Sequence, residues 1–579
     1  MGYHYIALIG SGRAQAIPQL SDAQAAVLGA RGMRALPMTG SVALYVAAET
    51  PAEAVPGGVV IGHVFTHDGK PAKLEDLPAQ TSARQLARHL LTHCWGEYLL
   101  IQTTCGPVPE LQVMREPSGG VPCIYSLEQG AGFVTSDSSL AVELGLHDRQ
   151  IDWDFITQAL AYPHVNTRRT GLSGVSELLP GCSLALRGAA VSVREDWLPW
   201  AFVSGRHRQV DPDKAAADIR EAVLTVSGAW ARTDKAVLVE LSGGLDSSIV
   251  AVSLQGADAQ VACSTLVTPV PGADERRYAG QVAHALGVAL HVEQLGFENA
   301  HFDFPLPVQT PKPRMSILQY VAHDAMTSAA RKHGAASFFS GGGGDTVFCY
   351  AAGAAPAADA FRERGLAGGL AAIRDLSRLH GCTLWKAGRL TLGKLRRGAR
   401  IPFRANASLL SPFLAIPELD RHPWFDAPEG ILPGDQERIA ELAGTQVFRD
   451  SAPRGSSHWL RFPLLSQPVV EACLKAPSWM WIAGGRNRAL ARQAFADQLP
   501  YEVLQRRSKG TFMSYLGAIY QRRKPLMRDY LLDGRLHARG LLDTEALERF
   551  FRTPLPPRDT SFMRVLDLCM IENWVRHQH

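Results

Sequence analysis

Residues 236–248 read AVLVELSGGLDSS and carry the strongest structural signal in the chain. The first six residues form a short, apolar, β-branched run, which is typical of a buried parallel strand. Two glycines follow, and apolar residues with helical spacing continue from Ser247 to Leu254. A strand that passes through a glycine turn into a helix predicts the first unit of an α/β domain.

The turn itself, residues 242–248, is predicted to bind phosphate. At the carboxyl end of a strand, free backbone N–H groups and the positive end of a helix face an anion. The glycines allow close approach, Ser247 and Ser248 supply hydroxyl donors, and Asp246 can hold Mg²⁺. The turn lacks the lysine of a Walker A loop and the spacing of a Rossmann fingerprint. A purely structural turn is the alternative, and the strand–turn–helix context favours the functional interpretation.

Strands and helices then alternate. Residues 261–267 predict a second strand, Tyr278, Val282 and Leu286 mark a helix, and residues 337–339 predict another strand. This alternation is typical of a doubly wound α/β domain with a parallel sheet. Beyond about residue 351 the pattern is largely helical.

A second glycine loop, residues 341–344, follows the strand at 337–339 and ends in Asp345. Four consecutive glycines are entropically costly, and they are best explained where the backbone must lie against a ligand. Asp345 then offers a second carboxylate for a metal ion. The alternative is a flexible linker, but a linker rarely follows a buried strand directly.

The first 200 or so residues have a β-rich pattern. Short apolar runs such as residues 42–46 and 98–101 alternate with glycine, proline and serine. Turn-forming and basic residues over 197–212 predict a domain boundary there. We therefore expect one domain over residues 1–205 and a second over residues 206–579, the latter beginning near a helix capped by Asp211.

Composition excludes several classes of protein. The chain has 579 residues, 46% of them apolar and 20% charged, which is typical of a globular protein with two to four domains. A formal charge of +4 gives no argument for nucleic-acid binding. Nine cysteines without a CxxC pair argue against disulfides and structural zinc and favour a reducing, cytoplasmic location. Neither a signal peptide nor a membrane span is expected.

One local charge cluster stands out, at residues 394–400 with Arg404 beyond it. A solvated helix or loop face explains such a run. A docking patch for an anionic partner or peptide is the sharper alternative.

The two loops, in this order and about 100 residues apart, resemble the synthetase domain of asparagine synthetases and β-lactam synthetases. The stretches 272–275, 461–465 and 506–510 agree, and 115–120 and 179–181 resemble the glutaminase domain of that family. The resemblance covers nearly the whole chain. It implies an α+β, Ntn-type, glutaminase-like β-sandwich domain, followed by an α/β ATP-pyrophosphatase domain with a helical C-terminal extension.

The resemblance also implies ATP and Mg²⁺ as cofactors and assigns site residues. Asp246 and Asp345 would hold Mg²⁺, and Lys509 would stabilise charge on the transferring phosphorus. The alternative for Lys509 is an ordinary surface lysine beside Arg506 and Arg507. The implied nucleotide-binding residues are Leu241, Ser242, Gly243, Gly244, Asp246, Ser247, Ser248, Leu266, Ser340 and Gly341.

Two departures narrow the comparison. The family's glutaminases use an N-terminal cysteine as nucleophile, but position 2 is Gly2 and the first cysteine is Cys94, so glutamine hydrolysis is not expected. Asparagine synthetases carry Glu, and β-lactam synthetases Tyr, three residues before the second metal aspartate, where this chain has Gly342. The loop is most similar to that of the lasso-peptide cyclases.

Such cyclases adenylate an Asp or Glu side chain of a precursor peptide and join it to the peptide's N-terminal amine. The resemblance implies a precursor peptide as substrate, with a leader-peptide-binding protein and a leader peptidase as partners, and neither nucleic acid nor membrane. Two alternatives stay open. One is a β-lactam-type or asparagine-synthetase-type amide ligase acting on a small amino-acid substrate, and the other is a non-catalytic, ATP-binding assembly subunit.

Overall fold

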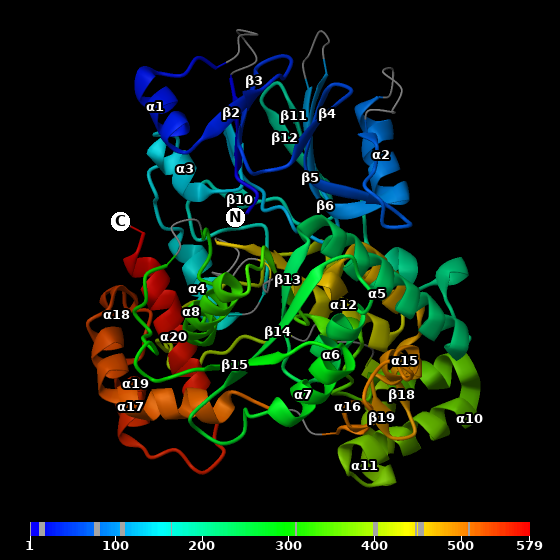
Figure 1. Cartoon of the computed structure of the whole chain (residues 1–579). Coiled ribbons are helices and arrows are strands. Elements are labelled where there is room, and N and C mark those ends of the chain that lie inside the picture. The colour runs from blue at the N-terminus through cyan, green and yellow to red at the C-terminus, as the bar shows by residue number, and fades with distance from the viewer. Residues whose placement is uncertain are drawn as a thin grey trace.

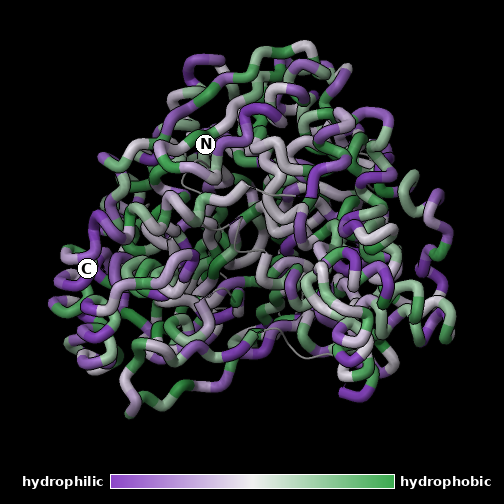
Figure 2. Tube along the Cα trace, turned by 90° about the horizontal axis from the view of Figure 1, so that it is seen from below, coloured by the Kyte–Doolittle hydropathy of each residue, from purple (hydrophilic) through white to green (hydrophobic). Residues whose placement is uncertain are grey.

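The computed structural model describes residues 2–10, 18–74, 82–104, 110–163, 165–306, 310–397, 403–445, 449, 457–507 and 510–578. Figure 1 shows the β-rich N-terminal part at the top, above a mixed α/β part and the helices that follow it. In Figure 2, hydrophilic segments are found mainly around the outline of the trace. None of the helices in these ranges is long and apolar enough to cross a membrane.

The N-terminal part is built from two antiparallel sheets of six strands each, in the orders β10-β8-β9-β1-β3-β2 and β12-β11-β7-β6-β5-β4. Alternate residues such as Tyr5, Leu44, Ile61 and Ile101 come from both sheets and share one buried core, so the sheets pack face to face. The strands of the first sheet are β1 (Tyr5–Ile9), β2 (Met33–Leu36), β3 (Val42–Ala47), β8 (Ile124–Glu128), β9 (Ala131–Thr135) and β10 (Ser176–Glu177). Those of the second are β4 (Ala52–Val55), β5 (Gly58–Thr66), β6 (Cys94–Thr104), β7 (Glu110–Arg115), β11 (Cys182–Arg187) and β12 (Ala190–Glu195).

Helices cover the outer faces of this sandwich. Ile6 and Leu8 of β1 pack in a core with residues of α1, α3 and α4, whereas Val60 and Leu100 pack in a core with residues of α2. The helices are α1 (Asp22–Ala30), α2 (Ala83–His93), α3 (Ser138–Glu143) and α4 (Trp153–Ala161).

The second part contains a parallel sheet of five strands in the order β15-β14-β13-β16-β17. The three strands predicted from the sequence are present. Two others were missed, because β15 is a half-polar LHVEQ segment and β17 has only three residues and follows a long helical region. The strands are β13 (Ala236–Glu240), β14 (Gln260–Val267), β15 (Leu290–Gln294), β16 (Ser337–Ser340) and β17 (Trp459–Arg461).

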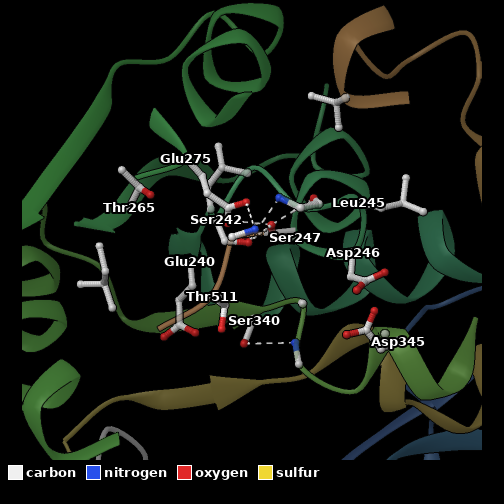
Figure 3. Close-up of a pocket in the computed structure, with 18 of the residues that line it drawn as sticks. Glu240, Ser242, Leu245, Asp246, Ser247, Thr265, Glu275, Ser340, Asp345 and Thr511 are labelled. Atoms are coloured by element: carbon white, nitrogen blue, oxygen red, sulfur yellow. Dashed lines mark hydrogen bonds between the residues drawn. The ribbon is translucent and has the colours of Figure 1, made fainter. Parts of the chain in front are cut away.

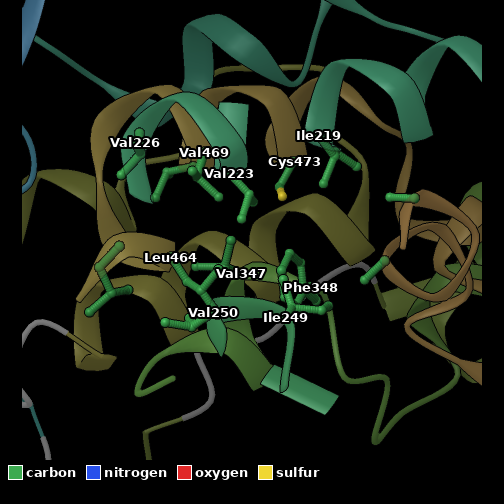
Figure 4. Close-up of a cluster of buried hydrophobic side chains, with 14 of the residues drawn as sticks. Ile219, Val223, Val226, Ile249, Val250, Val347, Phe348, Leu464, Val469 and Cys473 are labelled. Carbon is green, nitrogen blue, oxygen red and sulfur yellow. The ribbon is translucent and has the colours of Figure 1, made fainter. Parts of the chain in front are cut away.

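Helices lie on both faces of this sheet. Val237 and Val239 share a core with α5 (Pro212–Asp234), α6 (Leu245–Val252) and α7 (Arg276–Ala285). Leu238 faces the other way, onto Met326 of α8 (Ile317–Lys332). This is the doubly wound arrangement, and α5 starts as predicted, with Asp211 accepting hydrogen bonds from the first turn. Figure 4 shows α5 side chains in the same buried cluster as Ile249 and Val250 of α6.

The strand order places a topological switch point between β13 and β16. The chain runs outward from β13 to β14 and β15, and then returns to β16 on the other side of β13. In open parallel sheets, ligands bind in the crevice that such a reversal opens at the carboxyl ends of the strands.

The rest of the chain is largely helical, as predicted. Its helices are α9 (Gly344–Val347), α10 (Ala355–His380), α11 (Leu384–Arg397), α12 (Pro433–Thr445), α14 (Gln467–Lys475), α15 (Ala489–Ala494), α16 (Tyr501–Gln505), α17 (Met513–Leu532), α18 (Arg535–Ala538), α19 (Thr544–Arg552) and α20 (Phe562–Arg576). A small hairpin, β18 (Ile482–Ala483) with β19 (Arg486–Asn487), precedes α15. Short 3₁₀ segments are Pro199–Phe202, Gly205–His207, Pro423–Phe425, Pro463–Leu465 and Ser478–Trp481.

The basic run noted in the sequence lies partly at the end of α11. Lys394 forms an ion pair with Glu437 of α12, and Arg396 and Arg397 are exposed. Residues 398–400 lie outside the described residues. The eight cysteines that the structure describes are free thiols.

A buried ionic cluster joins the two parts of the chain. Arg461 of β17 donates to both carboxylate oxygens of Asp234 at 3.0 Å and to Glu97 of β6 at 2.5 Å. Its guanidinium also lies 3.9 Å from the ring centre of Trp230. All three charged side chains are almost fully buried, so Asp234 depends on this guanidinium for charge compensation, whereas Glu97 shares it with Arg449, which pairs with Glu97 at 2.9 Å.

We expect Arg461→Met to destabilise the protein by about 3–5 kcal/mol, because it leaves Glu97 and Asp234 buried with less compensation. The measurement is the midpoint of urea unfolding followed by tryptophan fluorescence. Arg421→Met is the matched control, since Arg421 pairs with Asp426 on the exposed surface and its loss should change little. Equal midpoints for the two variants would contradict this account.

Candidate active site

A cavity of about 440 Å³ lies at the carboxyl ends of β13, β14 and β16, at the switch point of the parallel sheet. Most of the site residues expected from the sequence line it. These are Leu241, Ser242, Gly244, Asp246, Ser247, Leu266, Ser340, Gly341 and Asp345. Residues that the sequence interpretation did not assign also line it, among them Glu240, Ser264, Thr265, Glu275, Met326, Thr346, Arg488, Arg492, Arg506 and Thr511.

The first loop is held by its own hydroxyl groups. The Ser247 hydroxyl accepts from the backbone N–H of Ser242 at 3.2 Å and lies 3.0 Å from the Ser242 hydroxyl. Ser242 Oγ in turn accepts from the N–H of Gly244, the N-cap residue of α6. The loop therefore presents two serine hydroxyls and a helix N-terminus to the cavity, a combination suited to binding an anion. Figure 3 shows both serines between Glu275 and Asp246.

Two of the residues expected to bind the nucleotide do not line the cavity. Ser248 is fully buried, and its hydroxyl has no hydrogen-bond partner among the described residues. Gly243 has a φ of +73° and packs against α7, where an added Cβ would lie 2.8 Å from the backbone nitrogen of Ala279. Sequence spacing alone could not distinguish these two positions from their neighbours, because only the turn geometry decides which residues face the cavity.

The second glycine loop lies against the first loop. An added Cβ at Gly341 would come within 2.5 Å of the Ser247 backbone nitrogen, and one at Gly344 within 2.5 Å of Asp246 Cβ. Real Cβ atoms do not approach this closely. The glycines were expected because of close approach to a ligand. The structure gives a different reason for Gly344 and adds one for Gly341, because here the close neighbour is protein.

Gly342 also has no space for a side chain. A Cβ at this position would lie 2.8 Å from Cε1 of Phe462, the residue that directly follows β17. The ring therefore occupies the space that a larger side chain would need. This explains locally why the position at which related synthetases carry Glu or Tyr is a glycine here.

Asp246 of α6 and Asp345 of α9 face each other, as Figure 3 shows. One nitrogen, Arg488 Nη1, donates to both oxygens of Asp246 at 3.0 Å and to Asp345 Oδ1 at 2.8 Å. The two carboxylates thus converge on a single cationic atom. Hard carboxylate oxygens that converge on one point are suitable ligands for Mg²⁺, so these two residues fit the expected metal.

Other guanidinium groups lie around the cavity. Arg506 donates to the carbonyl of Gly243 at 3.1 Å and pairs with Glu275. Burial, with the charges of Arg488 and Arg486, lowers the pKa of Arg492 to about 10, so this side chain stays protonated at neutral pH. Together they make part of the wall positive, as binding of a triphosphate requires.

Lys509, expected to act on the transferring phosphorus, lies outside the described residues. Arg506 and the backbone N–H of Gly510 both donate to Glu275 Oε1, the latter at 2.7 Å. Glu275 therefore contacts the two described residues Arg506 and Gly510, which line the cavity with it. The sequence identified the stretch 272–275 by resemblance without assigning this role to Glu275.

A row of polar side chains crosses the sheet below the loops. Glu240 of β13 is in register with Ser264 of β14 and with Ser340 of β16. Residues in register on parallel strands point to the same face, so the three side chains form one edge of the cavity. The signal that could have found Glu240 is a charged residue at the end of an otherwise apolar strand.

Fold and site together define a doubly wound α/β protein with a loop suited to binding an anion and two carboxylates suited to holding a metal ion at its switch point. The sequence model of the family described as asparagine synthase matches residues 219–576, more than half of the chain. The chain belongs to the asparagine synthase family. This is a group of ATP-dependent, AMP-forming amide ligases, which agrees with the chemistry expected from the two loops.

No curated protein matches the sequence. Among solved structures, the allosteric regulatory enzyme of purine biosynthesis has 11% identity over 52% of this chain and 82% of its own, with a TM-score of 0.22. Glutamine phosphoribosylpyrophosphate amidotransferase from B. subtilis, complexed with ADP and GMP, has 11% identity over 58% and 90%, with a TM-score of 0.23. Neither likeness is close enough to support an argument about this chain. The glutaminase-like character of the N-terminal part stays a prediction.

We expect Gly344→Ala to lower ATP-dependent pyrophosphate release by roughly 10²-fold, because the new methyl group displaces Asp246 and misplacement by about 1 Å can cost that much. The assay is coupled pyrophosphate detection on folded protein. Gly393→Ala, in α11 with nothing within 4 Å of the added Cβ, is the matched control and should retain full activity. Normal release by Gly344→Ala would show that the contact between the loops is not required.

Proposed function

We propose that the protein is an ATP-dependent cyclase of a precursor peptide. An Asp or Glu side-chain carboxylate of the peptide attacks the α-phosphorus of ATP, and pyrophosphate leaves. The N-terminal amine of the same peptide then attacks the acyl adenylate. AMP leaves with the former carboxylate oxygen, the nitrogen loses a proton, and an isopeptide macrolactam forms, as in a lasso peptide.

The observation that carries the adenylating half is the convergence of two loops on one cavity. The loops that follow β13 and β16 bring a helix N-terminus, two serine hydroxyls and two carboxylates together at the switch point. A carboxylate resists amine attack because its oxygen is a poor leaving group, and transfer of AMP removes that barrier. Membership in the asparagine synthase family supports the same reaction.

In this proposal, different residues of the cavity bind the phosphates and the metal ion. Ser242, Ser247 and the N-terminus of α6 bind the phosphates, and the guanidinium groups of Arg492 and Arg506 balance their charge. Asp246 and Asp345 would hold Mg²⁺, which when bound neutralises charge on the phosphate oxygens.

Two positions favour a peptide substrate whose own N-terminal amine is the attacking nucleophile. Gly2 stands where the family's glutaminases have their nucleophilic cysteine, so ammonia from glutamine is not expected to be the attacking nitrogen. Gly342, packed against Phe462, leaves no room for the acid/base residue of related synthetases. A peptide α-amine has a pKa of about 7.7–8.0, so a useful fraction is neutral without a dedicated base. Alignment of the two ends can contribute about 7–11 kcal/mol.

The partners proposed with this activity are a leader-peptide-binding protein and a leader peptidase of the same pathway. The test is ATP–pyrophosphate exchange with candidate precursor peptides, followed by mass spectrometry. A product lighter than the peptide by one water supports the cyclase. Exchange only with small amino-acid derivatives would favour a β-lactam-type ligase. ATP binding without exchange under any condition would favour an assembly subunit.

We expect Asp246→Ala and Asp345→Ala each to abolish exchange, and the double variant to lose little more than either single one. Both carboxylates are proposed to serve one metal–pyrophosphate unit, so their effects should be strongly non-additive. Circular dichroism checks that the fold is retained. Near-normal exchange by either single variant would remove that residue from the metal site.

We expect Lys509→Ala to lower turnover by roughly 10²-fold or more with little change in ATP affinity. An ammonium that meets charge developing on phosphorus stabilises the transition state more than the bound substrate. Single-turnover kinetics and nucleotide titration separate the two effects. Arg507→Ala is the control, since Arg507 is exposed, whereas Arg506 contacts Gly243 and Glu275 and is unsuitable. Equal losses in both variants would indicate a general basic patch.

A further inference from the structure

Arg488 lies where the metal-binding carboxylates of the proposed enzyme converge. Its Nη1 atom is within 3.0 Å of both oxygens of Asp246 and 2.8 Å from Asp345 Oδ1. The proposed function assigns these same oxygens to Mg²⁺. The guanidinium therefore competes directly with a divalent cation for one position, which neither the sequence interpretation nor family membership indicated.

The local structure is organised to hold Arg488 there. The residue is only 7% exposed and its Nε is a buried nitrogen without a hydrogen-bond partner among the described residues. Its backbone has φ 54° and ψ 37°, the left-handed conformation, directly before α15. A residue with a side chain adopts this conformation only where its surroundings hold it. The guanidinium carbon also lies 5.4 Å from the ring centre of Tyr350.

The charge of the cluster changes with what binds. Two carboxylates and one guanidinium sum to about −1, and adding Mg²⁺ alone would give a positive cluster in a partly buried site, which is unfavourable. Adding Mg²⁺ together with a triphosphate supplies several negative oxygens. Those oxygens can bind the guanidinium as well as the metal, because planar guanidinium groups bind phosphate strongly.

We propose that Arg488 is a positioning residue that makes metal binding at Asp246 and Asp345 depend on the nucleotide. This inference rests on the proposed function and adds to it that metal binding depends on the nucleotide. Without nucleotide, the guanidinium occupies the cation position and keeps the two carboxylates together. When Mg-ATP enters, the guanidinium releases the carboxylates to the metal and binds phosphate oxygens, so metal and nucleotide bind cooperatively.

The experiment compares wild-type protein with Arg488→Gln in two calorimetric titrations. One uses MgCl₂ alone. The other uses α,β-methylene ATP at saturating Mg²⁺, because this analogue cannot release pyrophosphate. We expect Arg488→Gln to bind Mg²⁺ alone about tenfold more tightly or better, since a competing charge is gone, and to bind the nucleotide about tenfold more weakly.

Two further variants separate charge from structure. Arg488→Lys keeps the charge, so its affinity for Mg²⁺ alone should stay within a few-fold of wild type. Arg486→Gln removes a nearby positive charge from β19. Its affinities should change far less than those of Arg488→Gln.

The proposal predicts that Arg488→Gln binds Mg²⁺ more tightly and the nucleotide more weakly, so the two affinities must change in opposite directions. Equal Mg²⁺ affinity in wild type and Arg488→Gln, or shifts of both ligands in the same direction, would overturn it. If Arg488→Gln does not fold, a tenfold gain in Mg²⁺ affinity by Arg488→Lys would also overturn it, because that variant keeps the charge. The titration with MgCl₂ alone needs no catalysis. Failure of ATP–pyrophosphate exchange therefore counts against the proposed function and leaves this comparison intact.

Discussion

The close contact between two loop backbones is the constraint on which the site depends. Residues 341–344 run so near the start of α6 that a single methyl group at Gly341 or Gly344 would collide with Ser247 or Asp246. Because Asp345 follows directly, this contact also fixes its carboxylate opposite that of Asp246. The cation position between them is thus a product of backbone packing, and the side chains need only point into the space that the backbones define.

The same contact extends into the rest of the molecule through β17. Phe462 follows Arg461 directly and packs on Gly342, while Leu465 packs on Gly343. Arg461 is itself held by Asp234 at the end of α5 and by Glu97 of the N-terminal part. A short strand at the sheet edge therefore links the N-terminal sandwich to the back of the glycine loop. This link gives the N-terminal part a structural role behind the glycine loop.

Electrostatics gives the cavity its second level of organisation. Three carboxylates of its lining pair with guanidinium groups, with Arg488 between Asp246 and Asp345, and Arg506 on Glu275. An anionic nucleotide that enters with a metal ion must rearrange these pairs. In the proposed function, the site therefore binds the complete metal–nucleotide complex in preference to either component alone.

The sequence alone determined the features that depend on local order. The apolar strand, the glycine turn and the helix spacing over residues 236–254 predicted the start of the parallel sheet, and the family assignment that rested on these motifs is confirmed for residues 219–576. Most of the expected cavity residues also line the cavity, because they are adjacent in sequence to predicted strand ends.

Only the tertiary structure decided the rest. Three features could not be predicted from any local sequence pattern. These are the three-residue strand β17, the turning of Gly243 and Ser248 away from the cavity, and the position of Arg488. Arg488 lies 143 residues after Asp345 and 242 residues after Asp246 in the sequence. The fold brings its Nη1 atom within 3.0 Å of oxygens of both carboxylates. Contacts over such separations are set by how sheets and helices pack, and packing is a property of the whole chain.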